Sequence, residues 1–188
     1  MAEKKNKRTF LNTFFTERKQ VGAVAPSSRF LVKKMCDKID FTEAKVIVEL
    51  GPGTGAFTYE LLKRARPDAQ IILFELNEVF LEILDQKFDD SRITILNKSA
   101  EDVEKVMKQM GHDQVDAILS SLPLTVIPDI TKKRIIINSY NILKKGGVYV
   151  QYQYSLNAKR LLEMKYGKLE MGFVGVNIPP AFIYVGTK

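Results

Sequence analysis

Strand-like and helix-like segments alternate from residue 45 to residue 154, and this alternation limits the possible folds more than any other feature of the sequence. The strand-like runs are KVIVEL (45–50), QIILFEL (70–76), RITILN (92–97), VDAILSS (115–121) and GVYVQYQY (147–154). The helix-like runs between them are AFTYELLKRA (56–65), EVFLEILDQKF (78–88), AEDVEKVMKQM (100–110) and ITKKRIIINSYNILK (130–144). The pattern predicts an α/β fold with parallel strands, right-handed helical crossovers and helices on both faces of the sheet.

The C-terminal part departs from this alternation. A helix-like run at 156–167 is followed by LEMGFVGVNIPPAFIYVGT (169–187), which has the pattern of two strands without a helix between them. This predicts an antiparallel hairpin at one side of the sheet. Residues 171–187 carry no charge, but their glycines and the Pro179-Pro180 pair favour a buried pair of strands over a membrane-spanning helix.

The N-terminal part is basic and amphipathic. Six basic residues and one acid lie between Lys4 and Lys19, and four large apolar residues there are spaced i, i+4. A helix with these residues either docks on the domain with its charges in water, or lies on an anionic bilayer or over an active site. A second helix is expected from about Ser28 to Lys38, after the helix-start residues Pro26 and Ser27.

Composition narrows the class of protein. The formal net charge of +7 indicates an anionic partner, either nucleic acid or an acidic lipid surface. The single cysteine and single histidine leave little material for a metal site, so no metal is expected. Without an apolar signal segment at the N-terminus, we expect a cytoplasmic protein. We expect one domain over residues 1–188, in which residues 1–40 form a helical cap or a membrane-contacting segment.

A glycine-rich turn follows the first strand in VIVELGPGTGAFT (46–58), with glycines at 51, 53 and 55. Glycines allow a sharp turn and the close approach of a ligand. Glu49 ends the strand before them and would repel a pyrophosphate but attract an amino or sulfonium cation. Glu75 ends the next strand, where a carboxylate can accept hydrogen bonds from ribose hydroxyls. These residues predict an S-adenosylmethionine pocket better than an NAD pocket.

With VELGPGTG followed by Glu75, the chain resembles the class I S-adenosylmethionine-dependent methyltransferases. The resemblance implies a Rossmann-like, seven-stranded, mostly parallel sheet with a C-terminal antiparallel hairpin. It also implies that the loop after the third strand lies beside the adenine. The cofactor-binding residues expected on this basis are Glu49, Gly51, Gly53, Gly55, Glu75, Ser99, Ala100, Glu101 and Ser120. The residues of the loop after the third strand are explained equally simply if Ser99 is the N-cap of a helix that carries acids in its first turn.

The stretch SSLPLTVIP (120–128) follows the fourth strand, where the chain is expected to reach the acceptor. Enzymes that methylate adenine amines carry Asn or Asp, then Pro, then an aromatic residue at this place, so that the base is hydrogen-bonded and stacked. Here the corresponding residues are Ser121, Pro123 and Leu124. A hydroxyl and a leucine suit a small aliphatic amine on a long apolar body better than a flat base.

Several segments together resemble bacterial phospholipid N-methyltransferases that act on phosphatidylethanolamine, a group related to the ribosomal RNA adenine dimethyltransferases. The segments are VGAVAPSSRFL, VELGPGTGAFT, FELN, SSLPL and NIPPAFIY, and they span nearly the whole chain. The resemblance implies a phospholipid substrate, with the protein held peripherally at the inner face of the membrane. The sequence departs from that family after the fifth strand, where QYQYSLNAKRLLEMKYG lacks the usual Gly-Pro and Ser-Pro pairs.

Candidate residues for the acceptor follow from these considerations. The residues expected to act on the amine are Ser121, Pro123, Tyr152 and Tyr154, and those expected to bind the lipid are Arg29, Leu122, Leu124 and Arg160. The two tyrosines share one face of a strand and can equally pack under a helix, and the two arginines can equally be solvated surface charges. The alternatives to lipid methylation are methylation of adenine in ribosomal RNA, which the sequence makes less favourable, and a lipid-associated cofactor-binding protein without catalysis.

Overall fold

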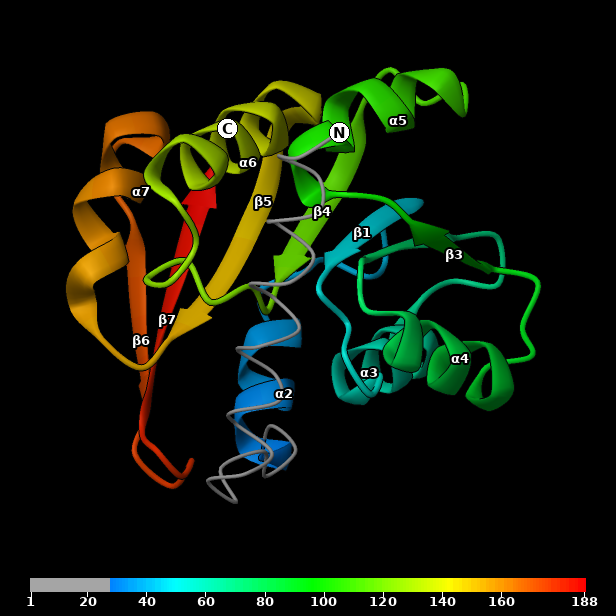
Figure 1. The fold of residues 1–188 in the computed structure, drawn as a ribbon, viewed down its shortest axis with the longest axis horizontal. Coiled ribbons are helices and arrows are strands. Elements are labelled where there is room, and N and C mark those ends of the chain that lie inside the picture. The colour runs from blue at the N-terminus through cyan, green and yellow to red at the C-terminus, as the bar shows by residue number, and fades with distance from the viewer. Residues whose placement is uncertain (1–27) are drawn as a thin grey trace.

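A computed structural model describes residues 28–188, which form a seven-stranded sheet with helices on both faces (Figure 1). The basic amphipathic segment expected at residues 4–19 and the helix-start residues Pro26 and Ser27 lie outside the described residues. The expected helix near Ser28 is present as α2, Arg29–Cys36, and the hydroxyl of Ser28 accepts the Leu31 N–H at 3.2 Å as its N-cap.

The order of the strands in the sheet is β3-β2-β1-β4-β5-β7-β6, and the first five are parallel. The strands are β1 Val46–Leu50, β2 Gln70–Glu75, β3 Ile93–Asn97, β4 Val115–Ser120, β5 Leu143–Gln153, β6 Glu170–Val174 and β7 Ala181–Thr187. The α/β fold with a seven-stranded, mostly parallel sheet is confirmed. One difference is that β5 begins at Leu143, which pairs with Val115 before a register shift, whereas the sequence predicted a start at Gly147.

Helices cover the sheet in two layers. They are α2, α3 Ala56–Arg64, α4 Glu78–Lys87, α5 Val103–Gln109, α6 Asp129–Ile142 and α7 Lys159–Tyr166, with short 3-10 turns at Ala100–Asp102 and Leu156–Ala158. Apolar residues of α2, α3 and α4 pack in one core layer, and those of α5, α6 and α7 pack in the other. Figure 1 shows α5, α6 and α7 together, with α3 and α4 across the sheet from them. No helix among residues 28–188 is long and apolar enough to cross a bilayer.

The C-terminal hairpin is present, because β7 pairs antiparallel with β5 and with β6. The expectation of a buried pair of strands is correct for β7, most of which is buried, but wrong for β6. As the last strand of the sheet, β6 has a neighbour on one side only, and Met171 and Phe173 are exposed on it.

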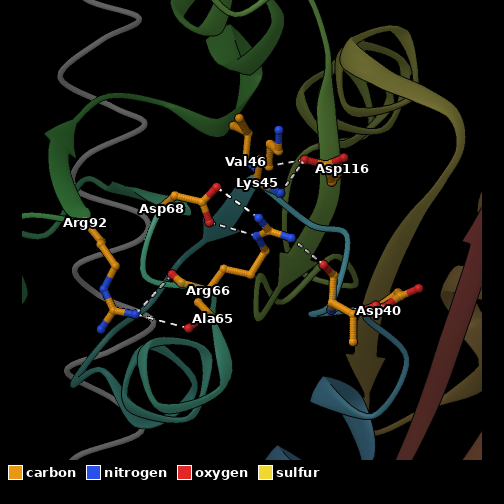
Figure 2. Close-up of polar contacts among 9 residues, drawn as sticks. Asp40, Lys45, Val46, Ala65, Arg66, Asp68, Arg92 and Asp116 are labelled. Carbon is orange, nitrogen blue, oxygen red and sulfur yellow. Dashed lines mark hydrogen bonds and ion pairs between the residues drawn. The ribbon is translucent and has the colours of Figure 1, made fainter.

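Polar contacts tie the loops together where the parallel strands begin (Figure 2). One carboxylate oxygen of Asp116, near the start of β4, accepts the N–H groups of Lys45 and Val46 at 2.8 Å each. The guanidinium of Arg92 donates to the carbonyl oxygens of Ala65 and Arg66 at 3.1 and 3.3 Å. These bonds satisfy loop backbone at this edge, so the opposite edge, where the parallel strands end, is the place for a binding site.

Candidate active site

The carboxyl ends of β1, β4 and β5 meet at one edge of the sheet. In the register of the sheet, Leu50 lies opposite Ser120, and Ser120 lies opposite Gln151. The chain adds β2 and β3 on one side of β1 and then crosses to β4 on the other side. Such a reversal leaves a crevice between the loops that follow the two strands, which is where ligands bind in sheets of this kind.

The glycine turn after β1 is shaped by close neighbours. Gly51 has φ +74°, and a Cβ atom there would lie 2.8 Å from a methyl carbon of Leu122. Gly55 has φ +80°, and a Cβ atom there would lie 2.4 Å from the ring of Phe88. A side chain at either position would combine left-handed backbone strain with a steric clash. The turn therefore needs glycine at both positions before any ligand is considered.

Glu49 is a buried carboxyl group with spare hydrogen-bonding capacity. Its Oε2 accepts the hydroxyl of Thr58 at 2.7 Å, whereas Oε1 is buried and has no hydrogen-bond partner among residues 28–188. Burial raises the pKa of Glu49 to about 8, and the nearby Glu75 also raises it, while the bond from Thr58 lowers it. An unpartnered carboxylate oxygen in such a place can bind a cation that would restore its charge.

Glu75 organises the backbone of the same edge. Its Oε1 accepts the N–H groups of Leu76 and Asn77 at 2.8 and 2.9 Å, and its Oε2 accepts the Gly53 N–H at 3.2 Å. Burial raises the pKa of Glu75, although these three bonds act in the other direction. The carboxylate therefore joins the end of β2 to the glycine turn. A Cβ atom at Gly53 would meet no atom within 4 Å, so the space beside this pair is open.

The loop after β3 has helix-capping geometry. The hydroxyl of Ser99 accepts the Glu101 N–H at 3.3 Å, and Ala100 is buried in the core. The Glu101 carboxylate lies 3.7 Å from the Arg134 guanidinium. The backbone carbonyl oxygen of Glu101 accepts a hydrogen bond from the side-chain amide of Asn138 at 2.6 Å. These contacts account for the three residues without a ligand, so their part in adenine binding stays a prediction.

Two glutamines of β5 hold the stretch that follows β4. The side-chain amides of Gln151 and Gln153 donate to the carbonyl oxygen of Leu122 at 3.0 and 2.8 Å. Both glutamines are buried, and the Tyr149 hydroxyl donates to the side-chain oxygen of Gln151 at 2.9 Å. Sequence reasoning missed this clamp. The signal was present in the two glutamines that alternate with tyrosines in a strand whose neighbours are apolar.

Within the clamped stretch the two leucines occupy different places. Leu122 is half-buried and lies against Gly51, whereas Leu124 is 1% exposed and packs in the core with residues of α5 and α6. Pro123 is half-buried between them. The hydroxyl oxygen of Ser121 is buried without a hydrogen-bond partner, and the hydroxyl of Ser120 accepts the Leu122 N–H at 3.4 Å. Leu122 and Pro123 are therefore the residues of this stretch that stay partly exposed at the carboxyl end of β4, whereas Leu124 is in the core.

Tyr152 on β5 and Tyr154 just after it lie on the opposite face of the sheet from the two glutamine side chains. Tyr152 stacks on Phe57 with ring centroids 5.9 Å apart, and it meets Tyr154 edge to face at 5.6 Å. Both pack against the core layer that includes α2 and α3. The two tyrosines therefore pack under helices, and a hydrogen bond from either hydroxyl to a substrate remains a prediction.

The two arginines expected to bind phosphate are not brought together. Arg29 is exposed at the start of α2, and Arg160 is exposed on α7, which lies on the other face of the sheet. A single phosphate cannot be held by both. Among residues 28–188 no group of three or more His, Cys, Asp or Glu side chains is placed to hold a metal ion.

Comparison with known proteins identifies the class. The model of the family described as ribosomal RNA adenine dimethylase matches residues 14–169. A Burkholderia thailandensis 1,6-didemethyltoxoflavin N1-methyltransferase, solved with S-adenosylhomocysteine, is 12% identical and superposes with a TM-score of 0.72 over 97% of this chain and 89% of that chain. A Thermus thermophilus 16S rRNA N2 G1207 methyltransferase, solved with S-adenosylmethionine, is 18% identical, with a TM-score of 0.66 over 88% of this chain and 44% of that chain.

Two relatives represent two kinds of acceptor. An ornithine lipid N-methyltransferase of Singulisphaera acidiphila is 27% identical over 93% of this chain and 92% of its own length. A ribosomal RNA small subunit methyltransferase A of Mycoplasma mycoides is also 27% identical, over 67% of this chain, and the match spans only 46% of its own length.

The fold and the family match together define an S-adenosylmethionine-dependent methyltransferase with a Rossmann-like sheet. More narrowly, the chain belongs to the ribosomal RNA adenine dimethylase family, because that model matches most of its length. The expectations of a class I methyltransferase, of S-adenosylmethionine as cofactor and of kinship with the adenine dimethyltransferases are thereby confirmed.

Proposed function

We propose that the protein transfers methyl groups from S-adenosylmethionine to the head-group amine of a membrane lipid. Phosphatidylethanolamine and its methylated derivatives are the acceptor class that the sequence suggests. The observation that carries this proposal is the composition of the stretch after β4, where the half-buried Leu122 and Pro123 are apolar, the hydroxyl oxygen of Ser121 beside them is buried, and none of the three residues is aromatic. The lipid-methylating relative, which matches over nearly the full length of both chains, supports the same acceptor class.

The residues around the glycine turn fit the cofactor. Glu49 offers a buried oxygen without a partner, which suits the cationic amino group of the methionine part. Glu75 lies beside the open space at Gly53, where its carboxylate suits the ribose hydroxyls. S-adenosylmethionine supplies an electrophilic methyl group on a sulfonium sulfur. Gly51, Gly55, Ser99, Ala100, Glu101 and Ser120 complete the proposed cofactor-binding set.

The acceptor amine must reach the methyl group with a free lone pair. Most aliphatic amines are protonated near neutral pH, and an apolar environment lowers the pKa of an ammonium group. Leu122 and Pro123 provide that environment, and the unpartnered hydroxyl oxygen of Ser121 can accept an N–H from the amine and orient it. Because the Leu122 carbonyl is held by Gln151 and Gln153, the wall is fixed in position before the acceptor arrives.

Peripheral membrane association is part of the proposal. The basic amphipathic segment within residues 4–19 would place cationic side chains near anionic head groups and its four large apolar residues in the acyl boundary. With residues 1–40 as the membrane-contacting part, residues 1–188 would act as one domain at the inner face of the membrane.

Methylation of adenine in ribosomal RNA is the second candidate, and the family match favours it. One observation weighs against it. The position of the stacking aromatic is taken by Leu124, whose side chain is in the core. Without a stacking platform an unstacked base loses its main compensation.

An assay with labelled S-adenosylmethionine distinguishes lipid methylation from methylation of ribosomal RNA. The full chain is incubated with vesicles that contain phosphatidylethanolamine, with vesicles that contain ornithine lipid, and with unmethylated ribosomal RNA. We expect the label in lipid, and the two vesicle preparations show which amine is preferred. Label in RNA alone would replace the first candidate by the second.

A further inference from the structure

A groove of about 400 Å³ lies between α2 and the loop that joins β6 to β7. Phe30, Lys33, Lys34 and Asp37 line it from one side of α2, and residues 173–176 line it from the hairpin. The most exposed large apolar side chains of this region are Phe30 at 66%, Val176 at 65% and Ile178 at 84%. Single exposed apolar residues are common, but Phe30 and Val176 line one groove and Ile178 follows in the same loop, and together they mark an interaction surface. We call these three residues the hairpin-tip surface.

The loop that carries this surface is firmly held. Asn177, between the two exposed aliphatic residues, is itself buried. Its side-chain oxygen accepts the Ser28 N–H at 3.1 Å, and its side-chain amide donates to the Pro179 carbonyl oxygen at 2.6 Å. The ammonium group of Lys34 donates to the Phe173 carbonyl oxygen at 2.9 Å. The hairpin is thus fastened to α2, and the exposure of Val176 and Ile178 follows from a defined loop conformation.

The charge around the surface is positive. Arg29, Lys33 and Lys34 are exposed on α2, and no ion pair within residues 28–188 uses any of them. Two acids of this region are already engaged, because Asp37, which lines the groove, pairs with Arg64, and Glu170 of β6 pairs with Lys38. Exposed aliphatic side chains ringed by unpaired cations are complementary to an anionic lipid surface.

The surface also lies on the correct side of the molecule. Gln151 of β5 is opposite Tyr184 of β7, and the hairpin continues past this row to the pair Val174 and Ala181 before its loop begins. Three residues of extended chain advance about 10 Å. The tip therefore projects beyond the edge that holds the glycine turn and the clamped stretch, in the direction in which β1 and β4 end. Figure 1 shows the hairpin tip and α2 beyond the carboxyl ends of β4 and β5.

We infer that the hairpin-tip surface docks on an anionic phospholipid bilayer, with Phe30, Val176 and Ile178 entering the interface and Arg29, Lys33 and Lys34 meeting lipid phosphates. This inference rests on the proposed lipid methylation, and it adds a contact separate from the N-terminal segment. We favour a bilayer over an RNA partner because Ile178, the most exposed of these side chains, and Val176 are aliphatic and suit an acyl boundary. Phe30 and Phe173 could also stack on bases, so RNA binding is one outcome of the test below.

The test measures partitioning of the full-length chain onto sedimenting phosphatidylcholine vesicles with and without phosphatidylglycerol. We expect the double variant Val176→Ser/Ile178→Ser to partition at least about tenfold more weakly onto anionic vesicles, because it loses the two most exposed aliphatic groups. The pair Arg29→Glu/Lys33→Glu should lose the preference for phosphatidylglycerol. Met164→Ser is the matched control, since Met164 is equally exposed but lies on α7. Unchanged melting temperatures confirm that all variants fold.

A second measurement separates this inference from the proposed function. Methyl transfer is assayed with a short-chain, monomerically dissolved phosphatidylethanolamine, for which docking is unnecessary. The Val176→Ser/Ile178→Ser protein should methylate this lipid at the wild-type rate but methylate vesicles more slowly. If that variant partitions onto vesicles like the wild type, the docking surface is wrong whatever is methylated. If the wild type does not methylate the dissolved lipid while the variant still loses vesicle binding, the docking surface is supported and the proposed lipid methylation is rejected. Weaker binding of ribosomal RNA by Arg29→Glu/Lys33→Glu, with vesicle binding unchanged, would assign the surface to RNA.

Discussion

Thr58 donates its hydroxyl to Oε2 of Glu49 at 2.7 Å, and both side chains are completely buried. Glu49 is the penultimate residue of β1, and Thr58 is in the first turn of α3, so the bond spans the glycine turn. It satisfies one of the two carboxyl oxygens and leaves Oε1 without a partner. The protonation state of Glu49 therefore depends on whether a cation occupies the space beside it.

The first prediction concerns stability as a function of pH. Burial raises the pKa of Glu49 to about 8 from an ordinary value of 4.5. A raised folded-state pKa means that the native state binds the proton more tightly than the unfolded state. The contribution of Glu49 to the free energy of unfolding is therefore fully present below pH 4.5 and is lost as pH rises through about 8. Urea unfolding of the cofactor-free protein at a series of pH values measures this loss.

Glu49→Gln is the control for that prediction, since its amide is always neutral. The difference in unfolding free energy between wild type and Glu49→Gln should change across this range and level off above it. Saturating S-adenosylhomocysteine, whose amino group is cationic, should reduce the pH dependence of the wild type. A difference between the two proteins that is constant with pH would contradict the buried, raised-pKa carboxyl.

The second prediction concerns the glycine turn. Gly51→Ala forces a side chain into left-handed backbone and within 2.8 Å of Leu122. Gly146→Ala is a matched control, because Gly146 has φ +79° but no atom lies within 4 Å of its Cβ position. The control should lose about 1–2 kcal/mol for backbone strain alone, whereas Gly51→Ala should lose more and should also bind S-adenosylhomocysteine more weakly. Calorimetric titration and thermal unfolding give both quantities, and equal losses would show that the contact with Leu122 yields easily.

The strands and helices were predictable from the sequence because each depends on local periodicity. The acids and glycines of the turn were predictable because they are close together in the chain. The clamp was not predictable from the sequence. Gln151 and Gln153 bond to the Leu122 carbonyl, about thirty residues earlier in the chain, and this contact depends on the pairing of β4 with β5 rather than on any local pattern. For the same reason Leu122 and Leu124 look alike in the sequence, although Leu124 is buried in the core and Leu122 packs against it only partly buried.

The third prediction concerns the clamp. Gln153→Leu removes one of the two donors to the Leu122 carbonyl oxygen and leaves Gln151 as the other. The loss of stability should be about 1 kcal/mol. The displaced wall should lower the rate of methyl transfer about tenfold or more, since small errors in position are costly for transfer. The affinity for S-adenosylhomocysteine should stay the same, because the glycine turn is untouched.

Single-turnover rates and cofactor titration separate these effects for Gln153→Leu. Gln86→Leu, an exposed substitution on α4, should leave both quantities unchanged. A normal rate of methyl transfer in Gln153→Leu would show that the clamp is not needed for catalysis.

The fourth prediction distinguishes the two leucines of the clamped stretch. Leu124 is 1% exposed in the core, so Leu124→Ala should lower the free energy of unfolding by about 2–5 kcal/mol, and its effect on transfer should follow the fraction of folded protein. Leu122 is half-buried beside Gly51, so Leu122→Ala should cost less stability but raise the KM for the lipid acceptor. Denaturant unfolding at a temperature where both variants are folded, followed by kinetics at the same temperature, gives the comparison. If Leu124→Ala were stable and raised the KM for the acceptor instead, the crevice would extend behind Leu122, and the argument against a stacked base at this position would lose its structural basis.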